Sequence, residues 1–144
     1  MGKDTPRVAE LLKRLYDEFW NERSFSILEE LVTPDCLLHF ADHSHLMLSE
    51  KSRKVQLAWV KSFPDLKFTI HEIIEQGDLA AMRLTFEGTH REEFEGVLPT
   101  KKRVQVTEML FAKARGGKIC EMWEDYDKLG MMKQLGFSLM KPTT

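Results

Sequence analysis

Seven residues near the end of the chain, EMWEDYD at positions 121–127, bring together groups that can transfer protons. A carboxylate buried beside aromatic rings has a raised pKa, because burial disfavours its charged form. Such a group can take up and release protons near neutral pH. The segment holds four carboxylates, Glu121, Glu124, Asp125 and Asp127, but carboxylates are common on protein surfaces, so their role depends on where the strand lies in the fold.

The direction in which each carboxylate points depends on the segment being a strand. If residues 118–127 are extended, Trp123, Asp125 and Asp127 share one face, because side chains alternate across a strand. A short apolar helix is expected to follow directly. Asp127 therefore has two interpretations: an acid/base group in a cavity, or the cap of that helix.

Five further residues are candidates for binding or catalysis. His39 and His90 could hydrogen-bond a substrate carbonyl or hold an acidic side chain, although lone histidines are more often structural. Arg83 could anchor a carboxylate or ester, with Glu108 across from it; alternatively, the two form an internal ion pair. Tyr16 could close the mouth of a cavity or belong to the core, with its hydroxyl at the rim.

The elements that must position these residues begin with helices. Apolar residues recur at helical spacing over 8–20, which predicts a long first helix. A shorter helix is predicted over 24–32, and a third is predicted to start near residue 50 and to stop at Pro64. A brief strand over 36–40 lies among them.

After Pro64 the hydrophobic period changes to two, which is typical of strands. Gly77-Asp78 and Gly116-Gly117 are the expected hairpin turns. Helices followed by an antiparallel meander predict a single α+β domain over residues 1–144, ordered from about 5 to 138, in which three helices pack on a bent, mainly antiparallel sheet. Strands are predicted near 66–70 and over 79–89, 103–114 and 118–126, with a closing helix that holds Met131, Met132 and Leu135.

Composition excludes several classes of function. The 144 residues carry a net charge of −2, so no electrostatic attraction to nucleic acid or anionic lipid is expected. No apolar run approaches the roughly 20 residues of a membrane span, and the first residues lack the pattern of a signal peptide, so a cytoplasmic location is predicted. Cys36 and Cys120 are expected to be two small buried side chains rather than a disulfide.

A metal site is not expected either. His39, Asp42, His43 and His45 lie close in the sequence, but their spacing matches neither a helical H-E-x-x-H motif nor a C-x-x-C pair. Proton transfer by a buried carboxylate requires no metal and no organic cofactor, so none is predicted.

An ordered set of motifs resembles the SnoaL-like polyketide cyclase family, also called ester cyclases, of the nuclear transport factor 2-like superfamily. Two glycines of the family pattern are replaced, by Glu92 and Lys101, and a position that needed positive φ would be strained by its replacement. The segment FADHSHLMLSE after His39 also departs from the pattern. The motifs are FPDLKF at 63–68, GD at 77–78, Arg83, GTHREEFEG at 88–96, PTKKR at 99–103, and GKICEMWEDYD with QLG between 117 and 136.

The resemblance implies a cystatin-type cone fold and a cofactor-independent intramolecular aldol cyclisation of a small apolar carbonyl or ester compound. By motif position it implies that Asp127 is the acid/base group, with Asp125 as the alternative, and that Trp123 and Phe40 border the substrate. Two other functions stay open: a binding module for a hydrophobic molecule, and a homodimer or higher oligomer formed through the sheet. An apolar outer face, exemplified by Met82, Leu84 and Phe86, would need a partner.

Overall fold

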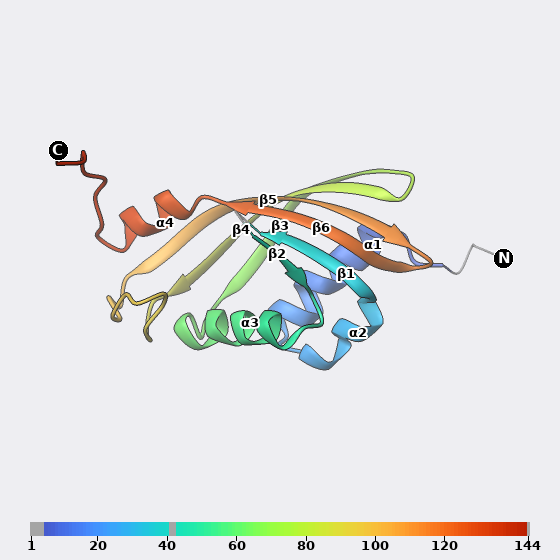
Figure 1. The fold of residues 1–144 in the computed structure, drawn as a ribbon, viewed down its shortest axis with the longest axis horizontal. Helices are drawn as coiled ribbons and strands as arrows, with labels where there is room; N and C mark the ends of the chain where they lie inside the picture. The colour runs from blue at the N-terminus through green and yellow to red at the C-terminus, as the bar shows by residue number, and fades with distance from the viewer. Residues whose placement is uncertain (1–4, 41–42, 144) are drawn as a thin grey trace.

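The computed structural model describes residues 5–40 and 43–143, which form a six-stranded sheet with helices on one side (Figure 1). The strand order is β2-β1-β6-β5-β4-β3. All neighbouring strands are antiparallel except β1 and β6, which are parallel, so the predicted α+β class and mainly antiparallel sheet are confirmed. The strands are β1 (Val32–Phe40), β2 (His43–Leu46), β3 (Lys67–Gln76), β4 (Leu79–Thr89), β5 (Arg103–Arg115) and β6 (Lys118–Tyr126).

The first predicted helix changes its winding halfway along. It begins as α1 (Val8–Arg14) and continues as the π-helix η2 (Leu15–Asn21), in which the wider turn rotates the side chains that follow. Leu15, Tyr16 and Phe19 of η2 are all buried against the sheet. The apolar spacing of the sequence predicts a helix here, but not the change to π geometry.

The other helices are short except for one. The predicted second helix is a 3-10 turn, η3 (Phe25–Ile27), followed by α2 (Leu28–Leu31). The third is α3 (Glu50–Ser62), whose cap Ser49 accepts a hydrogen bond from the Ser52 backbone N–H at 3.1 Å. The closing helix is α4 (Lys128–Gln134).

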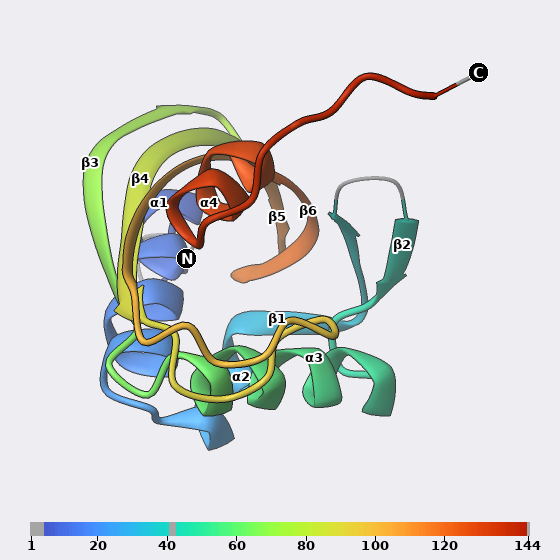
Figure 2. The same cartoon turned by 90° about the vertical axis from the view of Figure 1, so that its left-hand side faces the viewer.

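The sheet curls so that its concave face surrounds the N-terminal helix, with α3 below it, as the end-on view shows (Figure 2). Side chains of the central strands alternate between this inner face and the outer face. Met82, Leu84 and Phe86 are at most 3% exposed and point inward. The expectation that they form an apolar outer face is wrong, because the curvature directs them towards the core.

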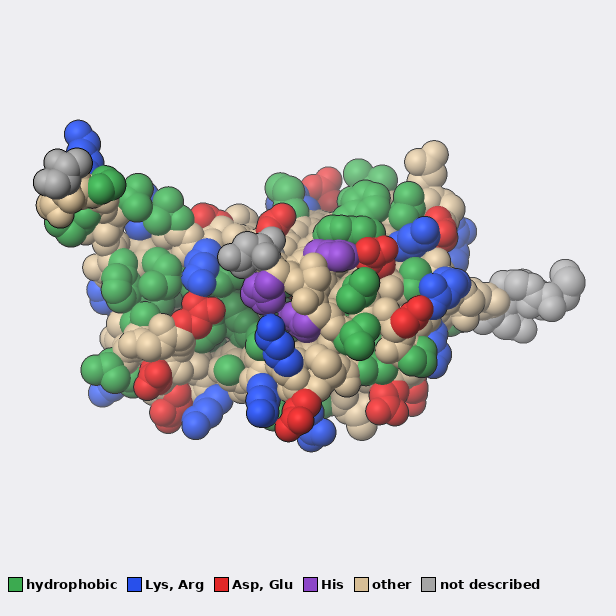
Figure 3. Space-filling view, viewed as in Figure 1, with side chains coloured by type: hydrophobic (Ala, Val, Ile, Leu, Met, Phe, Trp, Pro, Cys, Tyr) green, Lys and Arg blue, Asp and Glu red, His purple; other side chains and the backbone are tan. Residues whose placement is uncertain are grey.

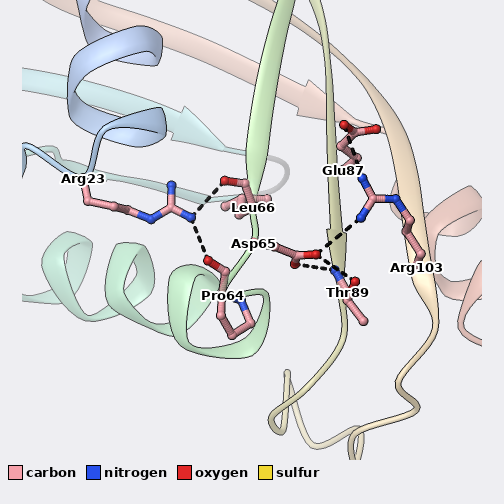
Figure 4. Close-up of polar contacts among 7 residues, drawn as sticks. All are labelled: Arg23, Pro64, Asp65, Leu66, Glu87, Thr89 and Arg103. Atoms are coloured by element: carbon pink, nitrogen blue, oxygen red, sulfur yellow. Dashed lines mark hydrogen bonds and ion pairs between the residues drawn. The ribbon is translucent and has the colours of Figure 1, made fainter.

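Charged side chains fix the connection between α3 and β3 (Figure 4). Arg23 donates to the carbonyls of Pro64 at 3.1 Å and Leu66 at 2.9 Å. Asp65 accepts from the backbone N–H of Thr89 at 2.7 Å and from its hydroxyl at 2.8 Å. The turn after α3 is thus tied to the segment after η2 by Arg23 and to the end of β4 by Asp65.

The loop between β4 and β5 contains two non-glycine residues in the left-handed backbone region. Glu95 has φ 48° and Lys101 has φ 62°. This conformation is unfavourable for residues with a Cβ. Lys101 replaces a glycine of the family pattern, so the expected strain falls on this residue, whereas Glu92 does not have positive φ.

Within residues 5–40 and 43–143, no helix combines the length and the apolar character that a bilayer crossing requires.

Candidate active site

A small cavity lies between the inner face of the sheet and the helices η2 and α3. Its volume is about 40 Å³. Aromatic rings form most of the wall, and two carboxyl groups are its only acidic members. The lining residues are Tyr16, Trp20, Phe40, Trp59, Phe68, Phe86, Glu108, Glu124 and Tyr126.

The two carboxyl groups of this cavity belong to neighbouring strands, Glu108 to β5 and Glu124 to β6. In the antiparallel pairing of β5 with β6, Glu108 lies opposite Tyr126 and Leu110 lies opposite Glu124. The two glutamates are therefore diagonal neighbours on the same face, a relationship that brings long side chains within reach of each other. Glu108 is 5% exposed, so its carboxyl group is almost completely removed from solvent.

Tyr16 connects the π-helical turn to the carboxyl pair. Its hydroxyl donates a hydrogen bond to Oε1 of Glu124 at 2.9 Å, and its ring packs edge-on against Phe68 with centroids 5.0 Å apart. The tyrosine is 1% exposed. Glu124 thus has a hydrogen-bond donor, the Tyr16 hydroxyl, which makes its electrostatic environment different from that of Glu108.

Burial changes the pKa values of this group. Burial, and then the nearby charge of Glu124, raises the pKa of Glu108 well above its usual value. Burial raises the pKa of Glu124 to about 7, against the opposing effect of the hydrogen bond from Tyr16. Near neutral pH the cavity therefore holds one protonated carboxyl group, Glu108, beside a second group, Glu124, that is close to its titration point.

Asp127 lies outside this cavity. It is exposed, and its Oδ1 accepts a hydrogen bond from the backbone N–H of Gly130 at 2.8 Å, so it caps α4. Asp125 is also exposed and pairs with Met109 on the outer face. The structure thus agrees with the interpretation of Asp127 as a helix cap. We do not assign proton transfer to Asp125 or Asp127.

His39 lies opposite Trp123 in the pairing of β1 with β6, and both point to the outer face, where Trp123 is 38% exposed. Figure 3 shows histidine and apolar side chains gathered on one face of the molecule. The rings of His39 and Trp123 stack with centroids 5.2 Å apart. Nε2 of His39 is 2.7 Å from Glu121, and its Nδ1 is 2.6 Å from the Ser44 hydroxyl. Neither residue lines the cavity, because Trp123 alternates with the inward-facing Glu124 along β6, and His39 lies opposite Trp123 in the pairing of β1 with β6.

Arg83 is also on the outer face. It makes a 2.8 Å ion pair with Glu72 of β3. Glu108 lies opposite Leu84 rather than Arg83 in the pairing of β4 with β5, so Arg83 and Glu108 point to opposite faces. The interpretation of an internal ion pair between them is wrong.

His90 is completely buried, but its side chain contacts the loop between β4 and β5 and does not line the cavity. Its Nδ1 accepts a hydrogen bond from the backbone N–H of Thr100 at 3.2 Å. The ring stacks on Phe63 with centroids 5.5 Å apart. This position corresponds to the structural alternative for a lone histidine.

Of the residues predicted for the site, Tyr16, Phe40 and Glu108 line the cavity. Glu124 was not singled out, although it is the acidic residue held by Tyr16. Its position between Met122 and Tyr126 on alternate residues was the available signal, since these two share its face. Asp127 was instead chosen by its position in the family motif, on the face of Trp123 and Asp125, and the structure directs that face of β6 away from the cavity.

No metal site is found among residues 5–40 and 43–143, where no three His, Cys, Asp or Glu side chains are grouped suitably. Asp42, one member of the histidine-rich segment, lies outside the described residues. Cys36 and Cys120 are free thiols, and only Cys36 is fully buried.

The family model for SnoaL-like polyketide cyclases matches residues 10–135. The chain belongs to this family. IdmH, a proposed polyketide cyclase from Streptomyces antibioticus, is 31% identical, with a TM-score of 0.78 over 90% of this chain and 99% of IdmH. AclR from Streptomyces galilaeus, described as a proposed hydroxylase, is 27% identical, with a TM-score of 0.78 over 90% of this chain and 95% of AclR.

More distant structures share the fold. A proposed SnoaL-like polyketide cyclase from Jannaschia sp. CCS1 is 21% identical and has a TM-score of 0.80 over 92% of this chain and 93% of its own. Among curated protein sequences, none gives a significant match. The predicted family and cone fold are therefore confirmed, whereas the reaction is not fixed by similarity.

Proposed function

We propose that this SnoaL-like protein is an acid/base catalyst that closes a ring in a small apolar carbonyl or ester compound by intramolecular aldol addition. The observation that carries the proposal is the pair of carboxyl groups, Glu108 and Glu124, in one aromatic cavity. An apolar ligand alone would not require two buried acids, since burying each of them costs free energy.

The two glutamates have different roles in this reaction. Ionised Glu124 takes the proton from the carbon next to the substrate carbonyl, and the C–H electrons form an enolate. Protonated Glu108 donates a hydrogen bond to the enolate oxygen and stabilises its charge. The enolate carbon then attacks a second carbonyl of the same molecule, and the resulting alkoxide takes up the proton held by Glu124.

The difference between the two pKa values supports this division of roles. A base works best with a pKa near the working pH, and burial raises the pKa of Glu124 to about 7. The pKa of Glu108 is raised further by the charge of Glu124, so Glu108 keeps its proton and remains a donor. These transfers involve only side chains of the chain itself.

The size of the cavity limits what part of the substrate reaches these groups. One ordered water requires roughly 10–15 Å³ of such space, so a cavity of about 40 Å³ holds only a few atoms of a ligand. We infer that the reacting carbonyl enters the cavity and that the remainder of the substrate displaces the movable rings near its mouth.

A second candidate function is non-catalytic binding of a small hydrophobic molecule, which the mostly aromatic wall favours. The two functions differ in one measurable property. A catalyst with Glu124 as base exchanges the proton next to a bound carbonyl with solvent, whereas a binding module does not.

The experiment follows this exchange by NMR in D₂O, with a panel of aryl ketones as probes. For Glu124→Gln we expect the rate of deuterium incorporation to fall by ~10²–10⁴-fold, the usual contribution of a general base. Asp127→Asn is the matched control and should keep the wild-type rate. Binding of the ketones without exchange by the wild-type protein would favour the second candidate, and an unchanged rate in Glu124→Gln would remove Glu124 from the mechanism.

A further inference from the structure

A second chamber adjoins the cavity of the carboxyl pair. Its volume is about 50 Å³, and it lies between η2, α3 and the strands β1 and β2. Trp20, Phe40, Trp59 and Glu124 line both chambers. The two hollows are therefore separated only by a shared wall of three half-buried rings and one carboxyl group, so a ligand at the carboxyl pair is already next to the second chamber.

The second chamber has a polar group of its own. His45 of β2 lies opposite Leu38 of β1 in the pairing of these strands, and both side chains line the chamber. Nδ1 of His45 is buried and has no hydrogen-bond partner. On the other side of the chamber, Gln56 of α3 donates to the Ser52 hydroxyl at 3.2 Å, so these two polar side chains have each other as partners.

An unpartnered buried nitrogen is unfavourable and calls for an explanation. His45 is also kept uncharged near neutral pH: burial lowers its pKa, and His43 and Lys51 lower it further. A neutral imidazole offers either a donor or an acceptor at Nδ1, depending on its tautomer. A ligand hydroxyl or carbonyl in the chamber would supply the missing partner.

We propose that the substrate spans both chambers and that His45 binds a second oxygen group of the substrate, remote from the reacting carbonyl. This inference rests on the proposed function for the position of the reacting end. His45 is then a specificity-determining residue: it selects compounds that carry a hydroxyl or carbonyl oxygen at the far end over compounds that carry only hydrocarbon there. It contacts the substrate without touching the reacting atoms.

The position of His45 in the sequence fits this role. It belongs to the segment FADHSHLMLSE after His39, which departs from the family pattern. The remaining lining of the chamber is largely apolar, with Leu15, Phe19 and Met47 among its members. In such surroundings a single polar contact has a large effect on discrimination, because the alternative leaves a buried polar group unpaired.

The test uses two aryl ketones with the same carbon skeleton, one carrying a hydroxyl at the end remote from the ketone and one lacking it. Binding is followed by tryptophan fluorescence, since Trp20 and Trp59 form the shared wall, and by calorimetry. We expect the wild-type protein to bind the hydroxylated ketone about tenfold more tightly. His45→Phe should abolish this preference while keeping the affinity for the other ketone.

Two further variants make each outcome decisive. His71→Phe changes an exposed histidine on β3 and should keep the wild-type preference. His45→Gln retains a hydrogen-bonding side chain and should keep part of the preference, and it serves as the second variant if His45→Phe does not fold. Equal affinity of the wild-type protein for the two ketones, or an undiminished preference in His45→Phe, would overturn the proposal.

The same ligands separate this inference from the proposed reaction. Glu124→Gln should lose proton exchange and keep the preference for the hydroxylated ketone. If exchange depends on Glu124 but no preference exists, only the role of His45 fails. If the preference depends on His45 but no exchange is catalysed, the proposed reaction fails and the second chamber remains a specific binding site.

Discussion

Glu108 and Glu124 reach the same cavity from neighbouring antiparallel strands, offset by two positions in the pairing of β5 with β6. The offset gives the two carboxyl groups a common apolar environment but different partners, since only Glu124 accepts a hydrogen bond from Tyr16. A carboxyl pair of this kind has consequences for stability as well as for catalysis, and both can be measured.

The carboxyl pair should make the folded protein less stable as the pH rises. Both glutamates have raised pKa values in the folded state. The unfolded chain loses the two protons near pH 4.5, the ordinary pKa of a glutamate, whereas the folded protein still holds them there. The contribution of these two groups to the free energy of unfolding should therefore be highest below about pH 4.5 and fall steadily as the pH rises from 4.5 through about 7. Denaturant titrations between pH 5 and 9 measure this dependence.

Glutamine variants isolate that contribution. Glu108→Gln and Glu124→Gln cannot ionise, so each should reduce the loss of stability between pH 5 and 9 and make the protein more stable than wild type at pH 9. Asp125→Asn, at an exposed carboxylate on the outer face, is the control and should keep the wild-type pH dependence. A wild-type slope in both cavity variants would show that these carboxyl groups ionise freely in the folded state.

Removing the Tyr16 hydroxyl should move the pH profile of catalysis. The hydrogen bond from Tyr16 lowers the pKa of Glu124, so Tyr16→Phe should raise that pKa further. Because the base must be ionised, the acidic limb of the kcat/KM profile for proton exchange should shift to higher pH. Tyr126→Phe, at another tyrosine of the cavity wall, should shift the limb less. A profile that stays in place in Tyr16→Phe would contradict the assignment of Glu124 as base.

Asp127 should matter for stability rather than for activity. Its carboxylate caps α4 through the Gly130 backbone N–H, and loss of such a cap typically costs about 1 kcal/mol of stability. We expect Asp127→Ala to lower the free energy of unfolding by about this amount, while the proton exchange rate stays near wild type. Asp125→Ala, at an exposed position without a cap, should change neither. A large loss of exchange in a folded Asp127→Ala protein would restore the acid/base interpretation of Asp127.

The strain at Lys101 can be relieved. Its φ of 62° is unfavourable for a residue with a side chain by roughly 1–2 kcal/mol, whereas glycine adopts it freely. Lys101→Gly should therefore stabilise the protein, by up to about 1 kcal/mol after the greater flexibility of glycine in the unfolded chain is subtracted. Lys102→Gly, at a neighbouring residue without positive φ, should destabilise it. Thermal unfolding of the two variants compares them directly; equal effects would mean that the backbone at Lys101 carries no strain.

The sequence was sufficient for the order of the main elements. Period-two alternation located β4, β5 and β6. Glu108 was named only as the residue across from Arg83, and it lines the cavity although it lies opposite Leu84 instead. The choice between the two faces of β6 could not be made from the segment alone, because it depends on a bulge near Cys120 and on the direction of sheet curvature. Both arise from pairing with distant strands, so the alternation gave two sets of residues without saying which set faces the helices.

The strand β2 shows a second limit. Its four residues, HSHL, have neither apolar alternation nor high β-propensity, so nothing in the segment predicts a strand. It forms because the end of β1 offers an unpaired edge, and Leu38 lies opposite His45 in the resulting pair. The second chamber therefore could not be foreseen, since its polar group is placed by long-range pairing.

The outer face of the sheet remains the predicted surface for a second copy of the chain, although through other residues than expected. Ile74, Phe111 and Trp123 are 72%, 42% and 38% exposed. They belong to one cross-strand row, because Ile74 pairs with Ala81, Ala81 with Phe111, and Phe111 with Trp123. A continuous apolar row on the outer face favours self-association, since a two-fold axis can place the row against itself.

Light scattering after size exclusion tests this prediction. We expect the wild-type protein to be a dimer at micromolar concentration and Phe111→Lys to be a monomer, because a charge in the centre of the row would be buried without a partner. Leu139→Lys, at an apolar residue of the C-terminal tail that is 78% exposed, is the matched control and should leave the dimer intact. A wild-type monomer, or a Phe111→Lys dimer, would mean that the row is not an interface between copies.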